Sequence, residues 1–278
     1  MPALIQKGNQ GILRVRNIGS AIVATVLVST PGQTECPSQQ KIEAQLRQLD
    51  LTAAYRTEEF DLQPPWKLYE KAAEKPGKVF VDRSGKLGQA VVIAEIPVEA
   101  LWMAINDEDH YADGDYLPVE HSEVIDGTAR GERRILFQYF KRSGVSRWWI
   151  DEVVMNRELF EESDGRLWEL RWWDLMADRT EDGLPERYSD LGLSPIKESR
   201  GAWLMIPVSE SCTLIEYVTV SNPGGFLNLA QWFASGHVIR ENLEGLQRLA
   251  TEHIPEPHPE SRFLRPDGTV IEGPPASL

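Results

Sequence analysis

The order of the predicted elements constrains the fold of this chain more than any other feature of its sequence. Short segments rich in β-branched and aromatic residues follow one another, most of them with connections of hairpin length. Such spacing is typical of an antiparallel sheet, because parallel strands need a long crossover between them. The predicted strands are residues 78–82, 90–96, 120–125, 134–141, 148–155, 167–176, 202–208 and 212–220.

Helices are predicted before, within and after this sheet. Residues 42–49 and 66–74 have helical spacing, and a proline opens a short helix over residues 98–105. Residues 226–253 show the clearest helical pattern, because apolar residues recur at helical intervals over a proline-free stretch. The sequence therefore predicts an α+β chain that ends in a long amphipathic helix.

Charge is distributed unevenly along the chain. The formal net charge is −14, yet residues 1–34 hold only basic charged residues, and an apolar stretch follows at residues 18–28. A basic start before a short apolar run is typical of a secretory signal peptide, and the run is shorter than the roughly 20 residues that span a bilayer. Two interpretations of residues 1–35 stay open, a signal peptide or a disordered leader.

The compartment depends on how residues 1–35 are interpreted. A signal peptide predicts a secreted or periplasmic protein, whereas a leader leaves the chain in the cytoplasm. Cys36 and Cys212 are able to pair after export, but cysteines so far apart also occur by chance in cytosolic proteins. The acidic composition argues against a nucleic-acid partner, because affinity for phosphates depends on Lys and Arg.

Short motifs occur along the chain in a characteristic order. They are Trp66, Lys78-Val79-Phe80, Ile96-Pro97-Val98, Gly201-Ala202-Trp203 with Pro207, and Ser221-Asn222-Pro223-Gly224-Gly225-Phe226. With these motifs, residues 62–254 resemble the START family, the lipid-transfer domains related to the steroidogenic acute regulatory protein. The resemblance implies the helix-grip fold, in which a curved antiparallel sheet wraps around a long C-terminal helix and leaves a cavity between them. Residues 36–61 then form a helical extension, and residues 255–278 form a proline-rich tail.

Strand alternation, combined with this resemblance, gives candidate cavity residues. Alternate residues of a strand face the same side of a sheet, so each predicted strand offers two faces. The residues expected to line the cavity are Leu136, Gln138, Phe140, Trp168, Leu170, Trp172, Leu214, Glu216, Val218, Leu229, Phe233 and His237. Mostly apolar walls with a few polar groups suit one hydrophobic small molecule, a lipid or sterol-like compound.

Three classes of function are compatible with this arrangement. The leading hypothesis is a carrier of a hydrophobic ligand, with transient membrane contact during transfer. An enzyme of the cyclase/aromatase kind is the alternative, and it would use Asp151, Glu152, Glu216 or His237 as an acid or base in the same cavity. An interaction domain with a filled core is the third. Many family members carry an adjacent Arg-Asp pair in a central strand, whereas Arg147 and Asp151 are separated here. Ligand identity and oligomeric state are left open.

No metal site or cofactor is expected from the sequence. The 5 His show no H-x-x-H or H-E-x-x-H spacing, and no nucleophile elbow or phosphate-binding loop is present. Residues 109–120 superficially resemble a calcium-binding loop, but Tyr111 stands where the third position requires a ligand oxygen. The sequence therefore favours binding of a small molecule over metal chemistry.

Overall fold

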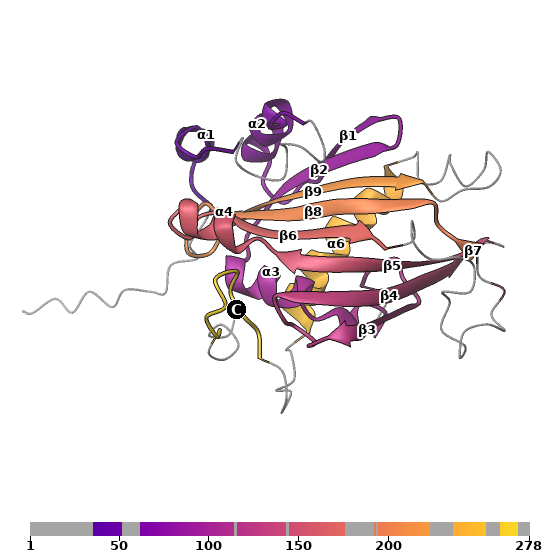
Figure 1. Cartoon of the computed structure of the whole chain (residues 1–278). Coiled ribbons are helices and arrows are strands. Elements are labelled where there is room, and N and C mark those ends of the chain that lie inside the picture. The colour runs from indigo at the N-terminus through magenta and orange to yellow at the C-terminus, as the bar shows by residue number, and fades with distance from the viewer. Residues whose placement is uncertain are drawn as a thin grey trace, which may run out of the picture. The chain divides into compact units, whose positions relative to one another are not determined.

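The described part of the chain is built around one antiparallel sheet, as the computed structural model shows (Figure 1). The structure describes residues 36–51, 62–113, 116–142, 145–175, 192, 194–222, 236–253 and 262–271. Its strands are β1 (Phe80–Ser84), β2 (Leu87–Ala94), β3 (His121–Gly127), β4 (Arg133–Arg142), β5 (Val145–Met155), β6 (Trp168–Asp174), β7 (Ser194–Pro195), β8 (Glu198–Pro207) and β9 (Thr213–Asn222).

The strands lie in the order β1-β2-β9-β8-β6-β5-β4-β3, and the short β7 pairs in parallel with β5. Neighbours along the sheet are therefore mostly neighbours in sequence, as hairpin-length connections predict. Gly85, between β1 and β2, has a φ of 61°, a left-handed conformation that glycine adopts without a steric penalty. There are two exceptions. β6 pairs with β8 because β7 lies off this order, and β2 pairs with β9, which joins an early strand of the chain to the last one.

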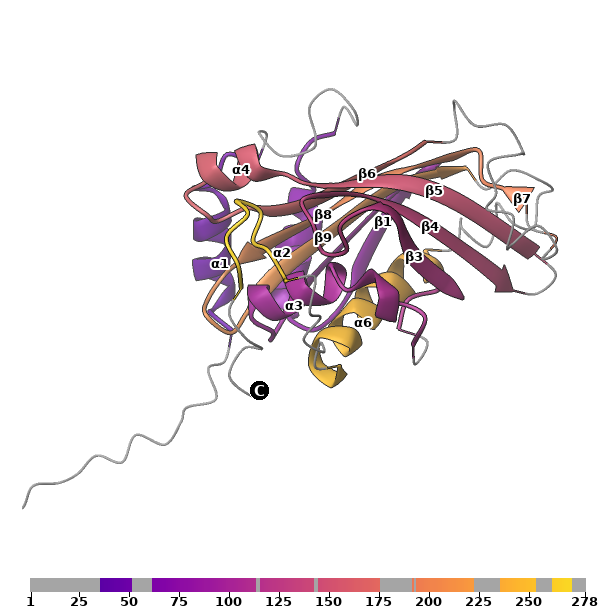
Figure 2. The same cartoon turned by 60° about the horizontal axis from the view of Figure 1, so that its bottom comes forward.

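The helices are α1 (Gln39–Leu46), α2 (Trp66–Glu74), α3 (Val98–Ile105), α4 (Arg157–Glu162) and α6 (His237–Glu252), with a 3₁₀ turn η1 (Glu108–His110). The sheet curves over α6, and α3 packs beside that helix (Figure 2). Ile239, Leu243, Leu246 and Leu249 recur at helical spacing and are buried on the side of α6 that meets the sheet and α3. This is the helix-grip fold. The predicted fold class is confirmed.

The C-terminal helix is shorter than the sequence predicts. A continuous helix over residues 226–253 is wrong, because α6 begins at His237 and follows Gly236, whose φ is 69°. A residue in that left-handed conformation cannot lie inside a right-handed helix. Residues 223–235 lie outside the described part of the chain.

Helices cover the inner face of the sheet and part of its outer face. The inner face packs against α3 and α6, while α1 and α2 pack against the outer face in a second apolar cluster. In β2, Val92 belongs to the inner cluster, whereas Val91 and Ile93 belong to the outer one. This double coverage explains why β2, β8 and β9 are nearly continuous apolar runs rather than alternating patterns.

Two further segments are tied to this body. A disulfide joins Cys36, just before α1, to Cys212, just before β9, with the Cα atoms 5.6 Å apart. Residues 262–271, which the sequence assigns to a proline-rich tail, contribute the buried Phe263 and Ile271 to the inner cluster. The indole of Trp102 on α3 donates a hydrogen bond to the Leu264 carbonyl at 2.7 Å, which fixes this segment against the helix.

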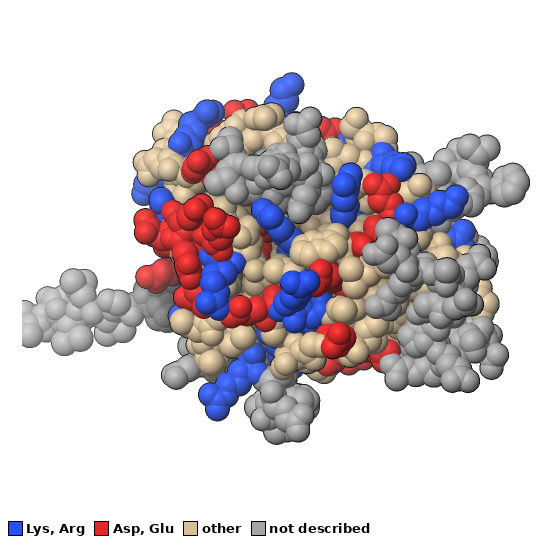
Figure 3. All heavy atoms as spheres, viewed as in Figure 1, with Lys and Arg blue, Asp and Glu red and all other residues tan. Residues whose placement is uncertain are grey.

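The surface is mixed in charge. Acidic and basic side chains are interspersed on the face drawn in Figure 3, and acidic ones gather over α4, which carries Glu158, Glu161 and Glu162. The described residues on this face form no continuous basic stripe of the kind that binds phosphate backbones. None of the described helices is both long enough and apolar enough to cross a bilayer.

Candidate ligand cavity

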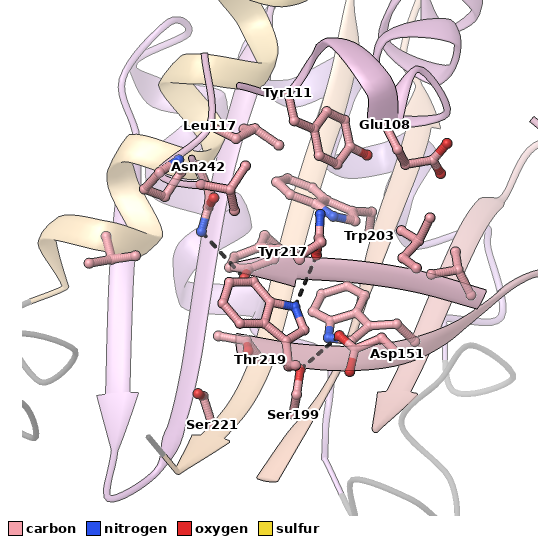
Figure 4. Close-up of a pocket in the computed structure, with 18 of the residues that line it drawn as sticks. Glu108, Tyr111, Leu117, Asp151, Ser199, Trp203, Tyr217, Thr219, Ser221 and Asn242 are labelled. Atoms are coloured by element: carbon pink, nitrogen blue, oxygen red, sulfur yellow. Dashed lines mark hydrogen bonds between the residues drawn. The ribbon is translucent and has the colours of Figure 1, made fainter. Parts of the chain in front are cut away.

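A cavity of about 160 Å³ lies between the inner face of the sheet, α6 and the segment that follows α3 (Figure 4). Strands β4, β5, β6, β8 and β9 form its floor, and Val238, Ile239 and Asn242 of α6 cover one side. Ile105, Glu108 and the residues from Leu117 to Val119 close another side. The cavity therefore occupies the position that the helix-grip fold predicts.

Aromatic rings form one wall of the cavity. Trp172 stacks on Tyr217 with ring centroids 5.7 Å apart, and Trp203 contacts the same tyrosine at 4.3 Å. Trp172 lies over Gly201, since a Cβ there would stand 2.1 Å from the indole Cζ2 atom. The absence of a side chain at Gly201 thus makes room for the ring.

Asp151 is the polar group that distinguishes the cavity floor. It lies on β5, is 3% exposed, and accepts a hydrogen bond from the Ser199 hydroxyl at Oδ2 with a length of 2.9 Å. Its other oxygen, Oδ1, is buried and has no hydrogen-bond partner. Burial, assisted by nearby Asp174, raises the pKa of Asp151 well above its ordinary value, although the Ser199 hydrogen bond opposes the rise. The environment favours a protonated carboxyl group that has hydrogen-bonding capacity to spare.

Gln138, Tyr217 and Asn242, three other polar residues that line the cavity, have hydrogen-bond partners within the protein. Gln138 accepts a hydrogen bond from the Trp149 indole at 3.0 Å and donates one to the Ser122 hydroxyl at 3.0 Å. Asn242 donates to the Tyr217 hydroxyl at 3.4 Å, and burial raises the pKa of Tyr217, which keeps that hydroxyl protonated. These groups are oriented by each other, so Asp151 is the better candidate to orient a ligand.

A buried ion pair between Arg134 and Glu108 holds one side of the cavity in place. Arg134 on β4 is fully buried and donates to Glu108 at 2.6 Å, to Asn106 at 2.8 Å and to the Gly131 carbonyl at 2.8 Å. Burial lowers the pKa of Arg134 to about 9, so the guanidinium stays charged at neutral pH. Glu108 lines the cavity, but its carboxylate is paired with this guanidinium and serves to position the turn after α3.

Five of the residues predicted from the sequence line the cavity. They are Leu136, Gln138, Phe140, Leu170 and Trp172. All of them come from β4 and β6, strands in which the predicted inner face is the inner face of the structure.

The prediction for β9 is wrong, because Leu214, Glu216 and Val218 point to the outer face. Glu216 pairs across the sheet with Val91 and Leu204, which belong to the outer cluster with Leu214 and Val218. The Tyr69 hydroxyl of α2 donates a hydrogen bond to Glu216, and Gln89 donates a second one at 3.4 Å. Glu216 is therefore a buried polar contact beneath α2, and the opposite face of β9 lines the cavity.

The remaining predicted residues do not line the cavity, or lie outside the described chain. Trp168 is packed in the inner core, edge-on against Trp102 with centroids 5.5 Å apart. His237 is the first residue of α6, has a side chain 61% exposed, and pairs with Glu241 at 3.1 Å. Leu229 and Phe233 lie outside the described residues.

Several cavity residues were not among those predicted. Ser199 and Trp203 line it from β8, for which no face was predicted, and Tyr217 and Thr219 line it from β9, for which the opposite face was predicted. Asp151 on β5 was predicted only as a candidate acid or base of the alternative enzyme. The continuous apolar runs of β8 and β9 were the available signal, since they indicate a sheet covered on both sides. Among the candidate acids, Glu152 lies on the outer side of β5 and pairs with Arg133, which leaves Asp151 alone in the cavity.

Comparison with known proteins gives matches in structure only. No family model matches the chain, and no curated protein matches its sequence. The chain is START-like in its fold. A START-related lipid transfer protein fragment from Xanthomonas axonopodis is 18% identical with a TM-score of 0.47, over 63% of this chain and 92% of that one.

Two further solved structures illustrate the range of START-like proteins that resemble this chain. Human StAR-related lipid transfer protein 5 is 13% identical with a TM-score of 0.48, over 77% of this chain and 95% of that one. The Zhui aromatase/cyclase from a Streptomyces species is 13% identical with a TM-score of 0.42, over 63% of this chain and 93% of that one. Two of these three proteins are named as lipid transfer proteins, and the third is named as an aromatase/cyclase.

Proposed function

We propose that this chain binds and carries one hydrophobic small molecule that has a polar group at one end. The observation that supports this most directly is the Oδ1 atom of Asp151, a buried oxygen without a partner in a cavity lined mostly by apolar side chains. A buried polar atom without a hydrogen bond is costly, so a ligand with a matching hydroxyl or carbonyl group stabilises the cavity when it binds. The apolar walls supply affinity, and Asp151 supplies orientation.

The size of the cavity limits the ligand that it accepts without rearrangement. Its volume of about 160 Å³ is smaller than that of most ligand pockets, which is roughly 300–1,000 Å³. A compact apolar molecule fits this conformation, whereas a lipid or sterol-like ligand requires α6 to move away from the sheet. The helix lies very close to β2, because a Cβ at Gly88 would stand 2.1 Å from the Ile239 Cδ1 atom. We therefore expect α6 to move as a unit when a larger ligand enters.

Ligand capture is the direct test. Protein purified from its own host is analysed by native mass spectrometry and then extracted with organic solvent, and we expect an apolar compound at one copy per chain. The emptied protein is then titrated with the neutral fluorescent probe N-phenyl-1-naphthylamine, which reports entry into an apolar site. Recovery of no compound together with no saturable uptake of the probe would overturn the proposal.

Neighbouring residues of β5 provide a matched pair of variants. Val153 lines the cavity, and Val154 is partly exposed on the opposite face of the same strand. Val153→Phe fills the cavity and is expected to abolish uptake of the probe, whereas Val154→Phe adds the same ring outside it and is expected to retain uptake. Equal uptake by the two variants would place the binding site elsewhere.

The second candidate function is an enzyme that uses Asp151 as a general acid or base. The raised pKa of this carboxyl group, in a cavity lined mostly by apolar side chains, is the observation that favours it. The two candidates differ in what happens to the compound extracted from the protein. A carrier releases it unchanged, whereas an enzyme converts it or its precursor, and Asp151→Asn then eliminates the conversion while uptake of the probe persists.

We also propose that the chain is exported, to the periplasm or to the medium. The disulfide between Cys36 and Cys212 supports this, because disulfides persist mainly in oxidising compartments. The basic start and apolar stretch of residues 1–35 point the same way. Fractionation of the native host, with mass spectrometry of the mature N-terminus, tests the proposal. Full-length protein with free thiols in the cytoplasm would contradict it.

A further inference from the structure

Asp107, His110 and His253 form a cluster at the end of α6 that is separate from the cavity. Asp107 follows α3, His110 ends η1, and His253 directly follows the last residue of α6. Their ligand atoms, Asp107 Oδ2, His110 Nδ1 and His253 Nε2, all lie within 4.8 Å of one another. The cluster therefore joins two segments that are remote in sequence, the turn after α3 and the end of the C-terminal helix.

The three atoms that converge in this cluster are buried and lack hydrogen bonds. Asp107 Oδ2 lies 3.0 Å from His110 Nδ1 and 3.2 Å from His253 Nε2, but neither pair forms a hydrogen bond. The imidazole planes are therefore not directed for donation to the carboxylate, although the distances are short enough. Buried polar atoms without partners are rare in folded proteins, and an ion that the atoms share is one of their explanations.

The donor set and the two separations from Asp107 to the histidines match a transition-metal site. Two imidazole nitrogens and one carboxylate oxygen are ligands of Zn²⁺, which binds them at about 2.0–2.2 Å in tetrahedral geometry. Donor atoms around such an ion stand about 3.3 Å apart, close to the 3.0 and 3.2 Å between Asp107 and the two histidines. Three protein ligands leave a fourth position for water, and the histidine side chains, 26% and 21% exposed, leave a path for entry.

The surroundings hold Asp107 in position for this role. Arg130 donates a hydrogen bond to the other oxygen, Asp107 Oδ1, at 2.7 Å, and its guanidinium lies 4.1 Å from the centre of the Phe263 ring. Outer partners of this kind orient a ligating carboxylate. Because Arg130 also offsets the charge of Asp107, we expect affinity for Zn²⁺ in the micromolar range rather than that of a buried structural site.

We propose that Asp107, His110 and His253 bind one divalent transition-metal ion, preferentially Zn²⁺, which fixes the C-terminal end of α6 to the turn after α3. The ion would restrain a helix that covers the cavity through Val238, Ile239 and Asn242. The proposal does not depend on what the cavity binds.

Metal titration of untagged full-length protein tests this site. After removal of metals with a chelator, we expect calorimetry to detect one Zn²⁺ per chain, and Co²⁺ to give the visible absorption of a tetrahedral complex. His110→Ala and His253→Ala are each expected to weaken binding by at least about tenfold. His237→Ala is the matched control, because His237 lies at the opposite end of α6 and pairs with Glu241.

Thermal unfolding supplies an independent readout. Zn²⁺ is expected to raise the unfolding midpoint of the wild type and of His237→Ala, and to leave those of His110→Ala and His253→Ala unchanged. Absence of stoichiometric binding to the wild type would overturn the proposal and leave an Asp–His cluster without a metal. Binding of equal strength by the His110→Ala and His253→Ala variants would overturn it as well, since the ion would then lie elsewhere.

Discussion

Asp151→Asn tests the environment of the cavity carboxyl group through the pH dependence of stability. Burial is the largest cause that raises the pKa of Asp151, Ser199 opposes the rise by donating a hydrogen bond, and Asp174 adds to the rise. The folded chain therefore holds this proton more tightly than the unfolded chain, in which an aspartic acid has a pKa of about 3.9. The mutation replaces the carboxyl group by an amide of the same shape, which still accepts the hydrogen bond from Ser199.

Proton linkage gives the sign and the size of the effect. Between the unfolded-state and folded-state pKa values, the folded chain binds one more proton at Asp151 than the unfolded chain does. The associated stability is thus fully present below about pH 4 and is lost as the pH rises toward the folded-state pKa. One proton corresponds to about 1.4 kcal/mol per pH unit, or at most about 2.7 kcal/mol between about pH 5 and pH 7.

The measurement is urea unfolding of the wild type and of D151N at a series of pH values, followed by tryptophan fluorescence. The wild type loses the stability contributed by the Asp151 proton as the pH rises, and D151N has no such proton to lose. We therefore expect the free energy of unfolding of D151N, relative to that of the wild type, to increase steadily with pH. D82N is the control, because Asp82 is exposed on β1 and its variant should follow the wild type. A difference between the wild type and D151N that stays constant over this pH range would refute the argument.

Three further substitutions test the fold and the cavity walls. The double substitution Cys36→Ser and Cys212→Ser removes a disulfide that spans a sequence separation of 176. Loop-closure entropy predicts that the free energy of unfolding in urea falls by up to about 5 kcal/mol. Equal stability of the wild type with and without reductant would contradict this. Gly201→Val displaces the Trp172 indole into the cavity. The variant should take up less probe and be less stable by about 1–3 kcal/mol. Unchanged uptake would show that Trp172 does not form a wall of the binding site. Arg134→Met leaves the buried acidic partner unpaired and should lower stability by about 3–5 kcal/mol, whereas a stability change below about 1 kcal/mol would show that the ion pair is dispensable.

Local sequence patterns carried most of the information needed to predict the fold. β-Branched runs, short connections and the amphipathic pattern of α6 are local properties, and they sufficed for an antiparallel sheet with a C-terminal helix. The start of α6 was mispredicted because periodicity alone does not register that Gly236 adopts a left-handed conformation. Apolar residues recur at helical intervals on both sides of Gly236, although the backbone is not helical at that residue.

The sequence of β9 alone does not decide which of its two faces points into the cavity. Glu216 and Tyr217 are both compatible with a cavity, and only the helices packed on the outer face decide between them. Tyr69 comes from α2, far away in sequence, and its hydroxyl gives Glu216 a buried partner. The histidines of the proposed metal cluster were missed for the same reason, because His110 and His253 become neighbours only through the packing of α6 against α3.

The cavity and the proposed metal cluster share two structural elements, the turn that follows α3 and the helix α6. Glu108 and Tyr111 of this turn line the cavity, whereas Asp107 and His110 lie in the cluster. The helix α6 covers the cavity near its start and brings His253 to the cluster at its end. If, as we propose, entry of a large ligand requires α6 to move, an ion bound at the cluster would oppose that movement. Linkage is reciprocal, so a metal that disfavours the open form must bind more weakly when a bulky ligand holds the helix away from the sheet. A compact ligand, which leaves α6 in place, should bind independently of the metal.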